Sequence, residues 1–356
     1  MDAYKVTKNS AEIFQKGIYL WSENHPRPMP WKGEKDPYKI WVSEIILQQT
    51  RVEQGRAYYE RFIKSFPTIK KLAEATIDKV LKLWEGLGYY SRARNLHETA
   101  KMIVTIYNGQ FPKGFEEILQ LKGIGIYTAS AIAAFAFDLL YAVLDGNVHR
   151  IFSRYLGIKK SMTSSLDKKY FQSIADQFLD KKSSGKYNQA VMDFGAMCCL
   201  PKNPMCSKCP LRKSCFAIKN NLLGELPIPK TQLKKRIRYF HYFIIVNNNK
   251  IYVNKRLEND IWKGLYEFPL IETSNKKFPH LEKDWILELS GSKRLKTILS
   301  GKQVLSHQLI HTYFYIAEGK IKSKKFRLIS FNQFSKLAFP VVIKKNRAFI
   351  KSQVQL

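Results

Sequence analysis

Four cysteines near residue 200 are spaced closely enough to bind one metal centre. Cys199, Cys206, Cys209 and Cys215 form the pattern C-x6-C-x2-C-x5-C. Four thiolates within one short loop can surround a tetrahedral zinc ion or a four-iron cluster, and the spacing alone does not choose between them. The neighbouring Cys198 is left over, and we expect it to be a small buried hydrophobic residue.

Glu44 is the first candidate for acid–base chemistry. A helical glutamate is usually solvated, but this one is flanked by Trp41, Ile45, Ile46 and Leu47. Removal from water favours the neutral carboxylic acid and raises its pKa. A general acid that works at neutral pH needs such a raised pKa, so the sequence predicts that Glu44 donates a proton.

The segment Leu121–Gly125 predicts an anion site. Gly123 and Gly125 lie in a turn between an apolar helix and a second helix that starts near Thr128. Backbone N–H groups in such a turn, at a helix N-terminus, can point outward together and bind a DNA phosphate. The alternative is a corner between two helices that serves packing alone.

The composition favours a polyanionic partner. The chain has 356 residues, with 60 Lys and Arg against 29 Asp and Glu, a formal charge of +31. Residues 1–225 contain 34 basic and 21 acidic residues, and residues 226–356 contain 26 and 8. Nucleic acid is therefore favoured over a membrane surface, and both halves are candidates to face DNA.

Neither a signal peptide nor a membrane span is predicted. The N-terminal residues MDAYKVTKNSAEIF lack an apolar stretch, and the longest apolar run, residues 131–144, contains Asp138 and is too short to cross a bilayer. Closely spaced cysteines in such a chain indicate a metal site rather than disulfides. We expect a cytoplasmic protein of a bacterium, associated with the nucleoid and monomeric.

Two domains have to position these groups. Residues 1–220 are predicted to be mostly helical, residues 221–238 to be a Pro-rich and then basic linker, and residues 239–356 to be an α+β domain. Helical periodicity predicts helices over Ala11–Trp21, Tyr38–Gln54, Ile77–Trp84, Leu96–Tyr107, Phe115–Leu121 and Thr128–Phe137. In the second domain we expect a β-hairpin over residues 239–256, strands over Leu309–Ala317 and Phe326–Ile329, and helices near Leu281–Leu289 and at the C-terminal end.

The cysteine pattern, directly after MDFGAMCC, resembles the iron–sulfur loop of the endonuclease III superfamily of DNA repair glycosylases. The Leu121–Gly125 turn resembles the helix-hairpin-helix of the same superfamily. That resemblance implies one [4Fe-4S] cluster on the four cysteines. It also places the catalytic aspartate of the superfamily at Asp145, in the segment LDGNVHR.

Four further motifs are similar to the MutY family, the adenine glycosylases of this superfamily. They are MPW at residues 29–31, DPYKIWVSE at 36–44, QQTRV at 48–52 and GLGYYSRARNL at 86–96. The similarity covers nearly all of residues 10–220. It implies a monofunctional enzyme that removes adenine mispaired with 8-oxoguanine or guanine in double-stranded DNA. The base must be flipped out because its glycosidic bond cannot be reached inside the stack.

The resemblance also implies roles for individual residues. Glu44 would protonate adenine N7, while Asp145 would stabilise, or briefly bond to, the sugar cation, supported by Tyr127 and Asn147. The DNA- and lesion-binding residues that it implies are Met29, Trp31 and Gln189 in the adenine pocket, Gln49 and Tyr89 beside the oxidised guanine, and Thr50, Leu87, Gly123 and Gly125 in the matching motifs.

Tyr127 bears on strand cleavage. In bifunctional members of the superfamily, this position is a lysine that forms a Schiff base with the sugar. A phenol cannot form an imine, so we expect base removal without strand cleavage by this route.

Residues 257–269, LENDIWKGLYEFP, resemble the MutT-like C-terminal domain that marks the MutY family. The metal-binding glutamates of the Nudix hydrolase signature are missing, so we expect no pyrophosphatase activity. Ser306 and His307 fall where the family has a Phe-Ser-His loop that recognises oxidised guanine. Leu305 replaces the aromatic residue, which removes any stacking role from that position.

The sequence therefore predicts a mostly α glycosylase domain, with a helix-hairpin-helix and an iron–sulfur loop, joined to an α+β MutT/Nudix-like domain. One alternative is an endonuclease III-type glycosylase and lyase that acts on oxidised pyrimidines. A second alternative is a non-catalytic DNA-binding iron–sulfur protein. Tyr127 and the second domain argue against the first, and Glu44 and Asp145 argue against the second.

Overall fold

The computed structural model describes residues 6–229, 234–276, 290–292 and 295–354. Contacts divide the chain into two compact units, each described separately below. The first unit comprises residues 1–73 and 98–231, and the second comprises residues 74–97 and 232–356.

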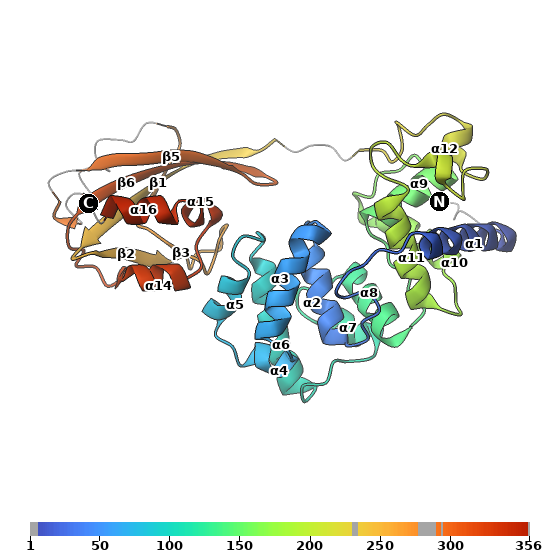
Figure 1. Cartoon of the computed structure of the whole chain (residues 1–356), viewed down its shortest axis with the longest axis horizontal. Helices are drawn as coiled ribbons and strands as arrows, with labels where there is room; N and C mark the ends of the chain where they lie inside the picture. The colour runs from blue at the N-terminus through green and yellow to red at the C-terminus, as the bar shows by residue number, and fades with distance from the viewer. Residues whose placement is uncertain (1–5, 230–233, 277–289, 293–294, 355–356) are drawn as a thin grey trace. The chain divides into compact units, whose positions relative to one another are not determined.

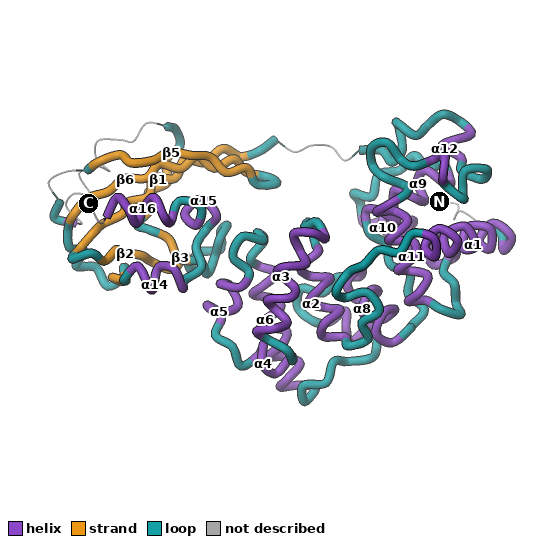
Figure 2. Tube along the Cα trace, in the orientation of Figure 1, coloured by secondary structure: helices purple, strands orange, loops and turns teal. Residues whose placement is uncertain are grey.

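Helices make up the regular structure of residues 8–219, as Figure 2 shows in purple. They are α1 (Lys8–Asn24), α2 (Pro37–Leu47), α3 (Val52–Ser65), α4 (Ile69–Ala73), α5 (Ile77–Leu83), α6 (Ser91–Ile106), α7 (Phe115–Gln120), α8 (Ile126–Phe137), α9 (Gly146–Leu156), α10 (Ser165–Phe178), α11 (Ser184–Met197), the short 3-10 helix η1 (Cys206–Lys208) and α12 (Phe216–Lys219). Phe14, Phe152, Phe171, Phe178 and Phe194 are fully or nearly fully buried in one core of the first unit. The mostly helical first domain that the sequence predicts is confirmed.

One predicted helix is wrong. The sequence predicts a continuous helix over Tyr38–Gln54, whereas α2 ends at Leu47 and α3 begins at Val52. Gln49, between them, has a φ of 59°, in the left-handed region that interrupts a right-handed helix. The backbone N–H of Thr50 donates to the carbonyl of Leu47 over 3.1 Å, which closes a tight turn at the break.

A mixed sheet forms the centre of the second unit (Figure 1). In its described part, the strands are β1 (Arg236–Asn247), β2 (Lys250–Lys255), β3 (Tyr266–Glu267), β4 (Leu270–Thr273), β5 (Lys296–Val304), β6 (Gln308–Glu318) and β7 (Arg327–Ile329). The order is β3-β2-β1-β6-β5, with β4 paired to β1 and β7 paired to β2. β1 and β6 run parallel, with Arg236 opposite Gln308, and the other pairs are antiparallel. Helices α14 (Phe331–Lys336), α15 (Val341–Lys344) and α16 (Arg347–Val354) follow the last strand.

The predicted hairpin over residues 239–256 is confirmed by β1 and β2, which pair antiparallel across Asn248 and Asn249. Both asparagines have positive φ, as a tight hairpin turn requires. The predicted strands over Leu309–Ala317 and Phe326–Ile329 are confirmed by β6 and β7. β5 was not predicted, and the expected helix near Leu281–Leu289 lies outside the described residues.

Residues 74–97 pack as part of the second unit, with Glu85 as the central contact. Its buried carboxylate accepts hydrogen bonds from the guanidinium of Arg347 at 2.7 and 3.2 Å. It also accepts one from the ammonium of Lys82 at 2.9 Å and one from the backbone N–H of Phe339 at 2.9 Å. The second unit is therefore built from two separate segments of the chain.

Across the parts of the chain that the structure describes, no helix has both the length and the apolar character to span a bilayer.

Candidate active site

A cavity of about 560 Å³ lies in the first unit. It brings together eight of the residues singled out in the sequence, which come from five separate stretches of the chain. They are Met29, Trp31, Glu44, Thr50, Tyr127, Asp145, Asn147 and Gln189. The predicted acid and the predicted aspartate therefore share one cavity, together with the residues expected to bind the base.

Glu44 lies on α2, whose other buried residues are mainly apolar, and its side chain is only 5% exposed. Its Oε2 accepts a hydrogen bond from the Tyr127 hydroxyl at 2.6 Å. Burial raises the pKa of Glu44 to about 7, an effect that the Tyr127 hydrogen bond opposes and the nearby Asp145 adds to. Because this carboxyl keeps its proton close to neutral pH, it can act as a general acid there.

Tyr127 lies on α8, just after the cap at Gly125. Burial, followed by the charges of Glu44 and Asp145, raises the pKa of Tyr127 well above its usual value. The phenol therefore stays protonated and donates to Glu44. The two partners are 83 residues apart in the chain, so the sequence alone did not predict this contact.

Asp145 caps the N-terminus of α9. Its Oδ1 accepts from the backbone N–H groups of Asn147 and Val148, both at 2.8 Å, and its Oδ2 accepts from the Asn147 side-chain amide at 2.9 Å. Burial raises the pKa of Asp145, opposed by these hydrogen bonds and by the charge of Arg150. Three hydrogen bonds fix both oxygens, so the carboxylate is oriented before any substrate arrives.

Arg150 is a site residue to which the sequence analysis gave no role. It is buried, and its Nη2 donates to Asn147 Oδ1 at 2.9 Å and to the Gly195 carbonyl at 2.7 Å. Its Nε donates to the Cys199 carbonyl at 2.7 Å. The arginine thus connects the cysteine loop to the residue that orients Asp145. The signal in the sequence was a pair of arginines, Arg150 and Arg154, four residues apart and therefore on the same face of a helix.

Asp193, also unassigned by the sequence, lies behind Gln189 and does not itself line the cavity. It is fully buried and accepts from Lys32 at 2.9 Å, from Arg27 at 3.4 Å and from the Gln189 amide nitrogen at 3.1 Å. Because a carboxylate can only accept, it fixes which end of the Gln189 amide faces it. The amide oxygen of Gln189 is then turned away from Asp193.

The predicted phosphate-binding turn lies between α7 and α8. Gly123 has a φ of 80°, which favours glycine, and Gly125 is the N-cap of α8. Both are exposed, and a Cβ added at Gly125 would meet no atom within 4 Å. The backbone is therefore open to a close approach by a phosphate. Gln49 is exposed and does not line the cavity, in contrast to its neighbour Thr50.

A second pocket, of about 340 Å³, lies within the second unit. Leu87 and Tyr89 line it, as do Ser306 and His307, so four predicted residues from two chain segments share this pocket. The hydroxyl groups of Tyr89 and Ser306 contact each other. Tyr89 is 41% exposed and has a φ of 46°, an unusual backbone conformation for a tyrosine. Strain of this kind is found most often at functional sites.

The four cysteines of the predicted metal site line one small cavity of about 30 Å³ in the first unit, and the buried Cys198 lines it as well. Its remaining walls are mainly apolar, apart from the buried Arg154, whose Nη1 lies 3.5 Å from the Cys199 sulfur. Arg154 also donates to the carbonyls of Leu200 and Pro201 and so fixes the loop. Among the described residues, no three or more His, Cys, Asp or Glu side chains are arranged to hold a metal ion. The thiols of Cys199, Cys206, Cys209 and Cys215, with a guanidinium beside them, nevertheless fit the donor chemistry of an anionic iron–sulfur cluster.

Both parts of the chain are similar to known protein families. Residues 42–176 match the HhH-GPD superfamily of base excision DNA repair proteins, and residues 241–347 match the NUDIX domain. The adenine DNA glycosylase of Buchnera aphidicola subsp. Schizaphis graminum is 36% identical over 303 residues, which are 84% of this chain and 86% of the relative. The mouse adenine DNA glycosylase is 38% identical over 234 residues, 63% of this chain and 45% of the relative. A thermostable thymine-DNA glycosylase of known structure is similar with a TM-score of 0.56 and 27% identity, over 60% of this chain and 99% of that one.

Proposed function

The chain belongs to the adenine DNA glycosylases of the HhH-GPD superfamily, and we propose that its substrate is adenine mispaired with 8-oxoguanine or guanine in duplex DNA. The observation that supports this most directly is the cavity in which Glu44, whose pKa is raised to about 7, and an oriented Asp145 lie together. The cavity is large enough for a nucleobase that has been flipped out of the duplex.

In the proposed reaction, Glu44 donates its proton to N7 of adenine. The leaving base then departs as a neutral molecule, and positive charge develops on the sugar. Asp145 stabilises this cation, or bonds to it briefly, until water attacks the anomeric carbon. The orientation of Asp145 costs nothing at the moment of reaction because the α9 N-terminus and Asn147 already fix it.

Met29, Trp31 and Gln189 bind the flipped adenine in this proposal. The Gln189 oxygen, turned away from Asp193, accepts a hydrogen bond from the exocyclic amino group of adenine. Guanine presents an oxygen at the same position and would be repelled. The Gly123–Gly125 turn binds a phosphate of the same strand.

The second unit recognises the opposite base. Ser306 and His307 offer a hydroxyl and an imidazole to the edge of oxidised guanine that differs from guanine at C8 and N7. Tyr89, in contact with Ser306, enters the base stack beside the lesion, and Leu87 lines the same pocket. In the first unit, Gln49 has the same inserting role and Thr50 binds DNA. The chain has a formal charge of +31, which favours binding to DNA. In this proposal the enzyme acts as a monomer at the bacterial nucleoid in the cytoplasm.

Cys199, Cys206, Cys209 and Cys215 would hold one [4Fe-4S] cluster. Bound there, the cluster would crosslink the loop, and Arg150 would carry that rigidity to Asn147 through the Cys199 carbonyl. Purified protein should then contain about four irons and four sulfides per chain. Stoichiometric zinc in colourless, fully active protein would contradict this assignment.

A single-turnover assay tests the function. Enzyme in excess should release adenine from an adenine:8-oxoguanine duplex and leave the strand intact until alkali is added. A duplex with an oxidised pyrimidine is the matched substrate for the endonuclease III-type alternative. Turnover of that duplex, with no release of adenine, would reverse the proposal.

A further inference from the structure

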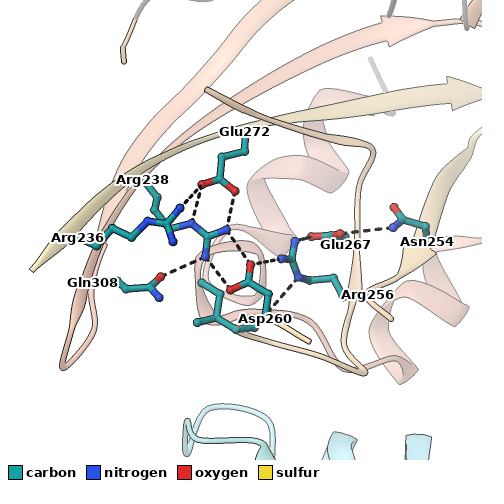
Figure 3. A network of polar contacts seen from close by, with 9 residues as sticks. Arg236, Arg238, Asn254, Arg256, Asp260, Glu267, Glu272 and Gln308 are labelled. Carbon is teal, nitrogen blue, oxygen red and sulfur yellow. Dashed lines mark hydrogen bonds and ion pairs between the residues drawn. The ribbon is translucent and has the colours of Figure 1, made fainter. Parts of the chain in front are cut away.

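Arg238, on β1, is the centre of a polar network in the second unit (Figure 3). Its side chain is only 6% exposed. The guanidinium donates to Glu272 at 2.7 and 2.5 Å, to Asp260 at 2.9 and 2.7 Å, and to Gln308 at 3.3 Å. An arginine has five N–H donors, and here each of them has a partner.

Arg256 extends the network on the other side of Asp260. It donates to Asp260 at 2.9 Å, to Glu267 at 2.7 Å and to the Ile261 carbonyl at 3.1 Å. The ring of the fully buried Phe240 lies 4.7 Å from the Arg238 guanidinium and 5.7 Å from that of Arg256. Asp260 is therefore held between two cations that are themselves fixed against an aromatic ring.

Among the partners of Arg238, Asp260 lines the 340 Å³ pocket, and Gln308 directly follows residues 303–307, which form another of its walls. Asp260 begins one wall, which continues through Ile261 and Trp262. Gln308 directly follows Ser306 and His307, which belong to the wall formed by residues 303–307. Its backbone carbonyl accepts from the N–H of Leu305 at 2.8 Å, which closes the turn that presents the serine and the histidine.

We propose that Arg238 is a positioning residue for recognition of the base opposite adenine, because one guanidinium holds both walls of the pocket at a fixed separation. The inference rests on the proposed function of Ser306 and His307. Arg238 itself does not line the pocket and acts through Gln308 and Asp260. Bidentate, charge-assisted hydrogen bonds have a defined direction, so they fix the relative positions of the groups that they join as well as stabilising the contact.

Loss of the guanidinium has a defined consequence. Asp260 and Glu272 would then face each other without the cation that separates them, and their like charges would repel. Gln308 would lose its charged donor at the same time. The pocket would open and the turn of residues 305–308 would become more variable, while the catalytic cavity belongs to the other unit.

The test compares Arg238→Gln with Arg236→Gln. Both changes remove one positive charge from β1, but the Arg236 side chain is 72% exposed and its ion pair with Glu272 is long, at 4.0 Å. The measurement is the ratio of initial rates on adenine:8-oxoguanine and adenine:guanine duplexes in the full-length enzyme. We expect Arg238→Gln to lower the ratio by about three- to tenfold, which is near or below the lower end of the loss caused by removing one base-discriminating contact. Arg236→Gln should leave the ratio unchanged.

A ratio is insensitive to the fraction of active protein, so a merely unstable variant does not mimic this result. Gln308→Met keeps the volume of the side chain and removes only the hydrogen bond with Arg238 at 3.3 Å. This variant tests the same proposal if Arg238→Gln does not fold. It should also lower the ratio. An unchanged ratio in Gln308→Met, or an equal fall in Arg236→Gln, would overturn the positioning role.

The double variant Ser306→Ala with His307→Ala separates this inference from the function on which it depends. If the double variant lowers the ratio and the Arg238 and Gln308 variants do not, the pocket recognises the lesion but Arg238 does not position it. If the double variant leaves the ratio unchanged, the proposed function of the pocket fails, and the positioning role fails with it.

Discussion

The cavity of about 560 Å³ in the first unit and the pocket of about 340 Å³ in the second are both bordered by carboxyl groups. In the first, Glu44 faces the neutral phenol of Tyr127, and burial raises the pKa of Glu44 to about 7. In the second, burial also acts on Asp260, but hydrogen bonds from Arg238 and the Ile261 N–H lower the pKa of Asp260. One carboxyl is kept able to release a proton, and the other is kept charged.

The difference between Glu44 and Asp260 shows that the neighbouring residues determine what a carboxyl group can do. A carboxyl without a cation retains its proton and serves proton transfer. A carboxylate between two guanidinium groups stays ionised and cannot donate a proton, but its hydrogen bonds fix its position. Changes in the first cavity should therefore alter the rate of base release, and changes in the second pocket should alter the choice of base pair.

The largest expected effect is on Glu44. Glu44→Gln keeps the shape of the side chain but removes the proton, so single-turnover release of adenine should fall by about 10²–10⁴-fold, the usual share of general acid catalysis. Duplex binding, measured by anisotropy, should persist. Glu53→Gln, at an exposed position of α3, is the control and should be near normal. Near-normal release by Glu44→Gln would remove the general acid from the mechanism.

The pH profile of the wild-type enzyme is the second test. Glu44 must be protonated to act, and its pKa lies at about 7, so the protonated fraction is high below pH 7 and falls above it. The single-turnover rate should accordingly drop by about tenfold for each pH unit well above 7. The small residual rate of Glu44→Gln should lack this decline. A wild-type rate that stays flat from pH 6 to about pH 9 is incompatible with the role given to Glu44.

The third test changes residues of the pocket in the second unit. Ser306→Ala with His307→Ala should lower the preference for adenine:8-oxoguanine over adenine:guanine by about 1–3 kcal/mol, the usual value of base-discriminating contacts. Release from a pre-bound adenine:8-oxoguanine duplex should fall less than the preference. The opposite pattern, a slow step with an unchanged preference, would mean that recognition of the lesion lies with Gln49 and Tyr89.

The smallest effect should come from adding a nucleophile. Tyr127→Lys places an amine where bifunctional relatives of the superfamily have one, so borohydride trapping on the product duplex should rise from a low background. Base release should fall at the same time, because the introduced ammonium would favour the ionised form of Glu44 and lower its pKa. Tyr127→Phe is the control and should not trap. Stoichiometric strand nicking by the wild type would show that Tyr127 does not decide this property.

Local patterns in the sequence predicted local structure well. The hairpin at residues 239–256 followed from aromatic and β-branched residues on both sides of three asparagines, and α8 followed from a run of apolar residues. The break after Leu47 could not be seen, because Gln-Gln-Thr-Arg contains neither glycine nor proline. β5 was missed because most of its side chains are exposed and it lacks an apolar alternation.

The site was less accessible to sequence analysis than the fold. The apolar neighbours of Glu44 indicated its role, motif resemblance named Asp145 and the residues around both, and the structure places them in one cavity. The partners that tune or orient them are distant in the chain, as for Tyr127 with Glu44 and Arg238 with Gln308. Such contacts depend on tertiary packing, and no local periodicity encodes them.

The buried contact of Glu85 with Arg347 sets an order of events during synthesis. Residues 74–97 leave the ribosome long before Arg347, and at about 5–20 residues per second the delay is on the order of tens of seconds. Throughout that interval, the Glu85 carboxylate lacks the guanidinium that binds it at 2.7 Å in the folded protein. The second unit therefore cannot be complete before α16, which begins at Arg347, has been made.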